Sequence, residues 1–231
     1  MQNLLLLHGA LGHAGQFDTL RPLLEKDFKI FTYNFSGHGD KQLPENLSID
    51  SMAQEVASYI ANEIKGETNI FGHSMGGYVG LCIARHGLAR LGKVMTLGTK
   101  LLWNPDTAAN ESRMLNVDKM KEKVPAFTAQ LEKIHGAKWE TLCEKVSAML
   151  VDMGHKPPLD KEDMAEIKIP VQLSLGDRDR MVTIEETVEA FRLLPNGRLL
   201  IMPGVSHPYE HVDIKRLAYK INGFFGAENV L

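Results

Sequence analysis

The sequence predicts an α/β protein built on a mostly parallel sheet of about six strands flanked by helices. Short apolar runs alternate with longer amphipathic stretches, most of these runs end at a glycine or a polar turn, and 231 residues suffice for one such domain. An apolar fraction of 44% and a net charge of −3 are ordinary for a globular protein. The balance of charge therefore gives no reason to expect a nucleic acid as partner.

The expected strands are short runs rich in Leu, Ile, Val, Phe or Thr. In chain order they are Leu4–Leu7, Lys29–Asn34, Asn69–Phe71, Lys93–Leu97, Val171–Leu175 and Arg198–Met202. The first run lacks the basic flank and cleavage site of a signal peptide, and it is too short to span a bilayer. We interpret it as a buried strand and expect a cytoplasmic protein without membrane insertion.

The expected helices lie between these runs, at Ser51–Glu63, Met75–Leu91, Ile184–Leu194 and Asp213–Phe225. The first of them carries apolar residues at helical spacing, such as Met52, Val56 and Ile60. Cys82 and Cys143 both fall in helical stretches without the spacing of a disulfide framework. The cysteine usage therefore indicates free thiols in a reducing compartment.

One region interrupts the alternation of strands and helices. Between Thr99 and Ile169 the sequence offers only helical pieces, such as Pro125–His135 and Lys138–Met153, punctuated by prolines. A helical insertion between two core strands is typical of a cap or lid over one end of the sheet. The alternative is a helical subdomain that only adds stability. We expect a core of residues 1–98 and 170–231 with a cap formed by residues 99–169.

The segment Gly72-His73-Ser74-Met75-Gly76 matches the pattern G-x-S-x-G. It follows an apolar run and precedes a helical stretch, which is the strand–turn–helix context that the pattern requires. Glycines at both ends allow a sharp turn that lifts the serine hydroxyl to the carboxyl edge of the sheet. The N–H groups of the following helix would then face a developing oxyanion. The pattern therefore predicts a serine nucleophile at Ser74.

A glycine-rich turn, His8-Gly9-Ala10-Leu11-Gly12, directly follows the first expected strand. Such a turn can aim a backbone N–H into the same cleft as a second oxyanion donor. A phosphate-binding turn is the other reading, but the glycines lack the G-x-G-x-x-G spacing and no acidic residue closes the next strand. The sequence therefore argues against a dinucleotide site.

A serine nucleophile needs a base and an orienting acid, which follow it in the order acid, then histidine. Asp177 and Asp179 follow the strand Val171–Leu175, and His207 lies in the loop after the last strand. Chemistry alone does not separate the two carboxylates. His211 is the rival to His207, but it falls near an expected helix start. All these groups would lie at the carboxyl edge of the sheet with the serine.

With these residues in place, the chain resembles the α/β-hydrolase superfamily over nearly its whole length, and most of all the small cytoplasmic carboxylesterase-type members with a helical cap. The resemblance implies Ser74 as nucleophile, His207 as general base and Asp179 as the acid. It also implies the backbone N–H groups of Ala10 and Met75 as the oxyanion hole. The sequence departs from the family at the opening antiparallel strand pair, which is absent because the chain begins at the strand before the glycine-rich turn.

We expect hydrolysis of a small carboxylic ester or thioester through an acyl-serine intermediate. The expected pocket residues are Leu11, Leu101 and Trp103, and the absence of a Lys or Arg cluster near the cleft loops favours uncharged acyl groups. The pattern of histidines and cysteines supports neither a metal nor a cofactor. Two alternatives stay open: a lyase that uses the triad as base, and a ligand-binding receptor with slow hydrolysis. The exact substrate and the oligomeric state stay open too.

Overall fold

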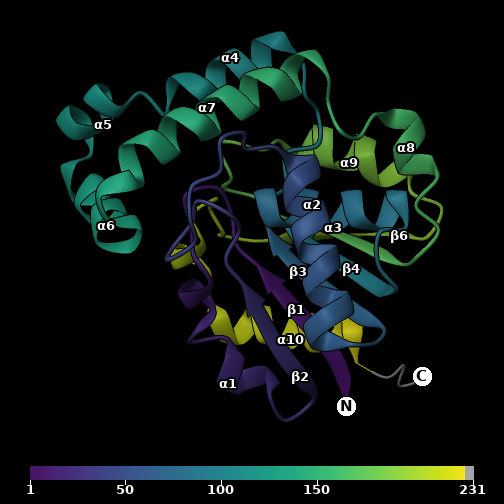
Figure 1. The fold of residues 1–231 in the computed structure, drawn as a ribbon. Coiled ribbons are helices and arrows are strands. Elements are labelled where there is room, and N and C mark those ends of the chain that lie inside the picture. Colours follow the sequence, from purple (N-terminus) through teal and green to yellow (C-terminus); the bar gives the residue numbers. More distant parts are fainter. Residues whose placement is uncertain (227–231) are drawn as a thin grey trace.

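The computed structural model describes residues 1–226, which contain a six-stranded sheet in the order β2-β1-β3-β4-β5-β6 (Figure 1). All five strand pairings in it are parallel. The prediction of a mostly parallel sheet of about six strands is confirmed. The strands are β1 (Gln2–Leu7), β2 (Phe28–Tyr33), β3 (Thr68–His73), β4 (Leu91–Leu97), β5 (Val171–Gly176) and β6 (Gly197–Met202).

Helices cover both faces of the sheet. The α-helices are α1 (Arg21–Leu24), α2 (Ile49–Tyr59), α3 (Met75–His86), α4 (Pro105–Arg113), α5 (Val117–Lys123), α6 (Pro125–His135), α7 (Trp139–His155), α8 (Lys161–Ala165), α9 (Ile184–Leu193) and α10 (Ile214–Phe225). Short 3-10 turns lie at Ala14–Phe17, Gly136–Lys138 and Tyr209–His211, and a π turn at Ile60–Ile64 extends α2. None of the helices within residues 1–226 is both long and apolar enough to cross a membrane.

The first strand shows how the core is divided. Leu5 and Leu7 point to one face, where they pack in a cluster with residues of α2, α3 and α9, whereas Leu4 and Leu6 pack with residues of α1 and α10 on the other face. This alternation follows from the two-residue period of a strand. All four side chains are fully buried, as expected for a parallel strand covered on both faces.

Two helix boundaries differ from the prediction for local reasons. The helix expected from Ser51 begins at Ile49, because the side chains of Ser48 and Ser51 cap each other's backbone N–H groups. The helix expected to reach Leu91 ends at His86, because Gly87 adopts a left-handed conformation (φ 60°) and stops it. Leu91 belongs to β4 instead.

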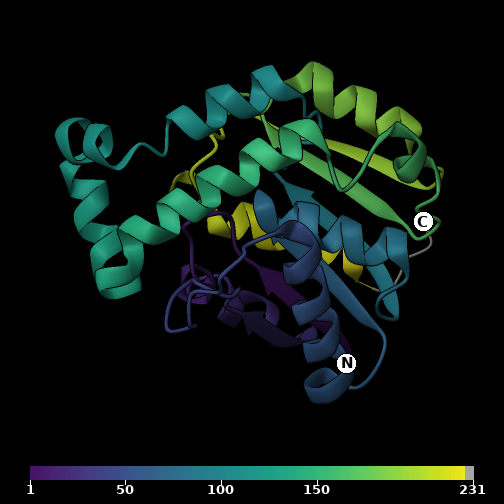
Figure 2. The ribbon, with the colours of Figure 1, turned by 45° about the horizontal axis from the view of Figure 1, so that its top comes forward.

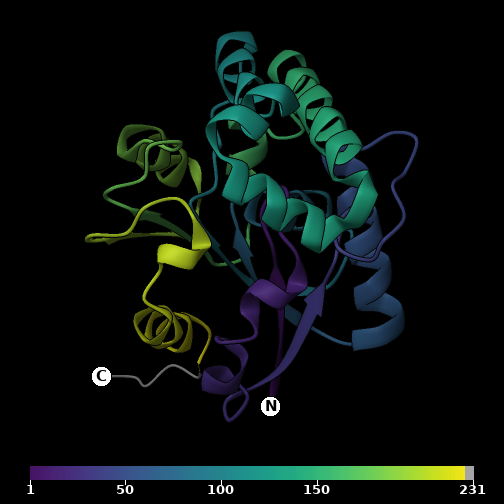
Figure 3. The same ribbon diagram turned by 90° about the vertical axis from the view of Figure 1, so that its left-hand side faces the viewer.

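The insertion between β4 and β5 is helical throughout the elements that the structure assigns to it, α4 to α8. Helices α4 and α7 lie side by side and cross above the carboxyl ends of the strands, and α5 and α6 extend this layer (Figures 1, 2 and 3). Its apolar side chains mostly join the core: Trp139, Met149 and Met153 are buried in the same cluster as α2 and α3, while Met114 and Phe127 are exposed. The insertion therefore roofs the edge at which a parallel sheet binds ligands.

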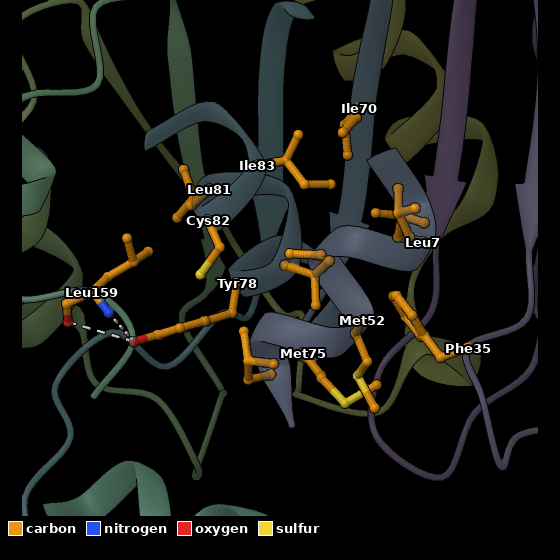
Figure 4. Close-up of a cluster of buried hydrophobic side chains, with 14 of the residues drawn as sticks. Leu7, Phe35, Met52, Ile70, Met75, Tyr78, Leu81, Cys82, Ile83 and Leu159 are labelled. Atoms are coloured by element: carbon orange, nitrogen blue, oxygen red, sulfur yellow. Dashed lines mark hydrogen bonds between the residues drawn. The ribbon is translucent and has the colours of Figure 1, made fainter. Parts of the chain in front are cut away.

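A buried tyrosine ties the core to the end of this insertion. The Tyr78 hydroxyl on α3 accepts a hydrogen bond from the Leu159 N–H (3.1 Å) and donates one to the Leu159 carbonyl (3.4 Å), as Figure 4 shows. Figure 4 also shows the apolar packing around α3, where Cys82 lies beside Leu81 and Met75 lies beside Met52. These contacts anchor α3, the helix that directly follows Ser74, to the end of the insertion.

Candidate active site

Ser74 lies on a strained turn between β3 and α3. Its backbone angles (φ 49°, ψ −118°) are rare for any residue other than glycine. Its N–H donates to the Leu97 carbonyl (2.8 Å), and its carbonyl accepts from the Thr99 hydroxyl (2.8 Å), so both backbone groups are held by the end of β4. A side chain on Gly76 would overlap the Leu7 carbonyl. The G-x-S-x-G pattern therefore forms the tight turn that the sequence predicts.

The structure brings the three residues expected to act together into one hydrogen-bonded row. Nε2 of His207 lies 3.2 Å from the Ser74 hydroxyl oxygen, and Nδ1 of His207 lies 2.8 Å from Oδ2 of Asp179. The other carboxylate oxygen of Asp179 accepts the N–H groups of Met181 (2.8 Å) and Val182 (2.9 Å). The Asp179 side chain is only 2% exposed. Each group in the row is thus oriented by the next, which is the arrangement needed to activate a serine.

The environment of Asp179 keeps its carboxylate ionised. Burial acts to raise its pKa, but the hydrogen bond and charge of His207 and the two backbone N–H donors outweigh burial, and the net pKa is lowered. Gly98 makes room for this pair. With φ at 64°, a Cβ at this position would lie 3.2 Å from Oδ2 of Asp179 and 3.3 Å from Nδ1 of His207. The ionised carboxylate holds the His207 proton on Nδ1 and leaves Nε2 free to accept one.

The rival side chains have other partners. Oδ1 of Asp177 accepts the Gly204 N–H (2.6 Å), which ties together two loops at the edge of the sheet. His211 lies 2.9 Å from the Ser206 hydroxyl in an exposed pair. His73 donates from Nε2 to the His207 carbonyl (3.0 Å), and burial lowers its pKa to about 4. His73 therefore supports the loop of His207 as a neutral ring.

A pocket of about 530 Å³, partly open to solvent, begins at Ser74 and His207. Apolar side chains of the core and of the insertion make up most of its wall, among them Tyr78, Trp103, Met149, Met153 and Val182. Ala10 and Met75 also line it. Among residues 1–226 neither of their N–H groups has an acceptor. Two free donors beside a serine are what an oxyanion hole requires.

The structure corrects two of the three expected pocket residues. Leu11 adopts φ 57° and packs into the core cluster, so it does not line the pocket at Ser74. Leu101 lines a separate cavity of about 680 Å³ between the start of the insertion and α9. Trp103 lines both cavities, and its indole N–H donates to the Lys100 carbonyl (3.1 Å). Side-chain direction, which a position in the sequence does not reveal, separates these three residues.

Sequence reasoning missed a charged group in the pocket. Lys100 and Glu111 both line it, and the Lys100 ammonium lies 3.6 Å from Glu111 and 3.5 Å from Glu186 and donates to the Met181 carbonyl (2.8 Å). Burial raises the pKa of Glu111, although Lys100 opposes this effect. Lys100 follows the end of the core strand β4 by three residues, and this position could have indicated that its side chain reaches the pocket. The expectation concerned a cluster of Lys or Arg near the cleft, and the residues that line this pocket include a single lysine, which is already ion-paired.

Replacement of Trp103 by alanine is expected to favour longer acyl chains, because the indole wall is shared by the two cavities. Each further buried CH₂ contributes about 0.8 kcal/mol, so two of them shift the relative kcat/KM by about 10-fold. The measurement is kcat/KM for acetyl and longer acyl esters, with Leu101→Ala as the control because Leu101 lines only the second cavity. Equal losses at every chain length would show that Trp103 only supports the structure.

Comparisons with known proteins bear on the family and the fold. The model of the Alpha/beta hydrolase family matches residues 4–217. The chain is 26% identical over 212 residues to a non-heme haloperoxidase of Rhodococcus erythropolis. This alignment covers 80% of this chain and 77% of the haloperoxidase. A thermophilic esterase from Thermogutta terrifontis superposes with a TM-score of 0.77 at 21% identity, covering 96% of this chain and 88% of the esterase.

The enol-lactonase of Burkholderia xenovorans superposes with a TM-score of 0.76 at 16% identity, covering 95% of this chain and 89% of the lactonase. At such identities these two structures support the fold alone. Within residues 1–226 no group of three or more His, Cys, Asp or Glu side chains is placed to hold a metal ion. The family match spans most of the chain and includes the serine turn, the buried acid and the histidine loop. The protein belongs to the alpha/beta hydrolase family.

Proposed function

We propose that this protein is a serine hydrolase that cleaves a small carboxylic ester or thioester through an acyl-serine intermediate. The observation that carries the proposal is the row Ser74–His207–Asp179 at the mouth of an apolar pocket that also exposes two free backbone N–H groups. A hydrolase family and this constellation together favour acyl transfer over other reactions. The helical insertion acts as the lid in this proposal.

The reaction follows from the positions of the groups. Nε2 of His207 accepts the Ser74 proton as the hydroxyl oxygen attacks the substrate carbonyl, and the Ala10 and Met75 N–H groups stabilise the oxyanion. His207 then returns the proton to the leaving alcohol or thiol, which departs as the acyl-serine forms. Water attacks this acyl group with His207 as base again, and the carboxylic acid is released.

The two alternatives have less support. A lyase that uses the triad as a base is expected to hold a free cation near the oxyanion turn, whereas the Lys100 ammonium is paired with Glu111 and Glu186. A receptor with slow hydrolysis would need a partner surface, and no observation on residues 1–226 favours one. We therefore propose a small-molecule ester or thioester as the substrate. The buried free thiols of Cys82 and Cys143 are compatible with the proposed cytoplasmic location.

The proposal is tested with p-nitrophenyl esters and acyl thioesters of graded chain length, assayed with the wild-type protein. We expect saturable turnover of at least the short and medium esters, with two products released in sequence. If a retro-aldol or elimination substrate were consumed while every ester remained intact, the protein would be a lyase and not an ester hydrolase. Turnover that is no faster than buffer for the whole panel would contradict ester hydrolysis.

A further inference from the structure

Three histidines from separate parts of the chain meet behind the glycine-rich turn. His8 follows β1, His38 lies in the loop after β2, and His135 ends α6 in the insertion. All three are buried. The ring centroids of His8 and His38 are 5.1 Å apart, and those of His38 and His135 are 5.8 Å apart. The row of Ser74, His207 and Asp179 uses none of them, so their burial needs another explanation.

His8 holds the peptide that carries the proposed oxyanion donor. Its Nε2 accepts the Phe35 N–H (3.3 Å), so the proton of the neutral ring is on Nδ1, which donates to the Gly9 carbonyl (2.8 Å). A trans peptide directs its N–H away from its C=O. The carbonyl of the Gly9–Ala10 peptide is held by His8 and by the Gly12 N–H (3.1 Å). The Ala10 N–H is therefore directed to the opposite side, and Ala10 lines the pocket at Ser74.

His38 and His135 hold the next residue from both sides. Nε2 of His38 accepts the Leu11 N–H (3.2 Å), while Nε2 of His135 donates to the Leu11 carbonyl (2.9 Å). Their other ring nitrogens are used as well: Nδ1 of His38 donates to the Ser36 carbonyl (3.1 Å), and Nδ1 of His135 accepts the Gly39 N–H (2.9 Å). Every ring nitrogen of the three histidines therefore has one partner, and each ring has one defined tautomer.

Leu11 needs this support because of its backbone. Its φ of 57° lies in the left-handed region, which is unfavourable for a leucine and persists only where the surroundings impose it. With the hydrogen bonds to His38 or His135 removed, the residue is free to return to an ordinary conformation, and the adjacent Ala10 peptide would turn with it. One of the two supports comes from the insertion, so the turn is fully held only when α6 is docked.

We infer that His8, His38 and His135 form a histidine clamp, a set of positioning residues that aims the Ala10 N–H at the oxyanion. The clamp deepens the proposed function and rests on it. None of the three touches the reacting atoms, and each acts through the backbone of the turn. Through His135 the insertion takes an indirect part in the reaction, since its docking completes the support of the turn that carries the Ala10 N–H.

The clamp works only with neutral rings. Burial lowers the pKa of all three histidines, that of His38 to about 3, and the other charged or titratable groups that act on them are His13 and Lys138, which also oppose a positive charge. A protonated ring carries an N–H on both of its nitrogens. One of these would then face the backbone N–H from which the neutral ring accepts a hydrogen bond. Because the folded pKa values are depressed, the stability that the clamp contributes is present above the ordinary histidine range and is lost as pH falls below it.

The clamp is tested with His135→Ala and His135→Gln, because glutamine carries one acceptor and one donor as the neutral ring does. For His135→Ala we expect kcat on p-nitrophenyl acetate to fall on the order of 10-fold to 100-fold, less than for deletion of an oxyanion donor, with little change in KM. His135→Gln should recover part of the loss. The matched control is His155→Gln, an exposed histidine on α7. A lower melting temperature with unchanged kcat would overturn the clamp and leave His135 a purely structural residue.

A second readout needs no substrate and separates the clamp from the proposed function. In ¹H–¹⁵N NMR spectra we expect the Ala10 amide resonance to shift in His135→Ala but not in His155→Gln. An Ala10 resonance that does not move in His135→Ala overturns the clamp, whether or not the protein hydrolyses esters. If no ester is turned over but the resonance moves as expected, the proposed function fails and the positioning of the turn stands.

Discussion

Replacement of Ser74 by alanine is expected to lower kcat for ester hydrolysis on the order of 10⁶-fold, the loss seen when a serine protease loses its nucleophile. The acyl intermediate cannot form without the hydroxyl, and only the residual acceleration of the oxyanion donors and of binding, on the order of 10³-fold over water, remains. The fold should persist, because the side chain of Ser74 makes its one hydrogen bond within residues 1–226 to His207. The measurement is steady-state turnover together with a melting curve.

The matched control is Ser206→Ala, since Ser206 also lies near a histidine, with its hydroxyl 2.9 Å from Nδ1 of His211. This pair is exposed and is not part of the row at the pocket. We expect wild-type turnover from Ser206→Ala. Loss of activity in Ser206→Ala with retention in Ser74→Ala would move the nucleophile to the Ser206–His211 pair.

Asp179→Asn is expected to lower kcat on the order of 10⁴-fold while the protein remains folded. The side-chain carbonyl of the asparagine can still accept hydrogen bonds from the N–H groups of Met181 and Val182. The side-chain NH₂ of the asparagine then faces Nδ1 of His207. The ring must take its proton on Nε2 to accept that donor, and Nε2 can no longer accept the Ser74 proton. The expected signature is a loss in kcat with little change in the melting temperature.

Asp177→Asn provides the comparison, since both carboxylates follow the same strand and only their partners differ. Asp177 accepts the Gly204 N–H (2.6 Å), and its side chain is 33% exposed. Loss of this charged acceptor should therefore cost stability of about 1 kcal/mol and leave turnover nearly unchanged. Turnover and melting curves for both variants decide the matter. If Asp177→Asn lost the activity and Asp179→Asn lost only stability, the role of the acid would move to Asp177.

The sheet and the row at Ser74 could be predicted because each depends on local sequence and on chain order. A buried parallel strand is a short apolar run, and the serine turn needs its glycines at fixed positions. The order serine, acid, histidine then places Asp179 and His207 at the same edge of the sheet. These features need no knowledge of how side chains pack.

The pocket wall could not be predicted because it depends on packing between distant segments. Leu11 stands next to Ala10 in sequence, yet its left-handed backbone turns it into the core. Lys100, at the start of the insertion, pairs with Glu186 of α9, which lies much later in the chain. The contact of His135 with a turn 124 residues earlier is equally invisible to a pattern search. Long-range contacts of this kind leave no periodic signal in the sequence.

The most direct test of the central claim is the detection of the acyl-serine itself. The wild-type protein is mixed with p-nitrophenyl acetate, quenched in acid within the first turnovers, and weighed by intact-protein mass spectrometry. We predict an added mass of one acetyl group that maps to the peptide containing Ser74 and that is absent from Ser74→Ala. Turnover without any adduct, or an adduct on another residue that Ser74→Ala retains, would contradict the account.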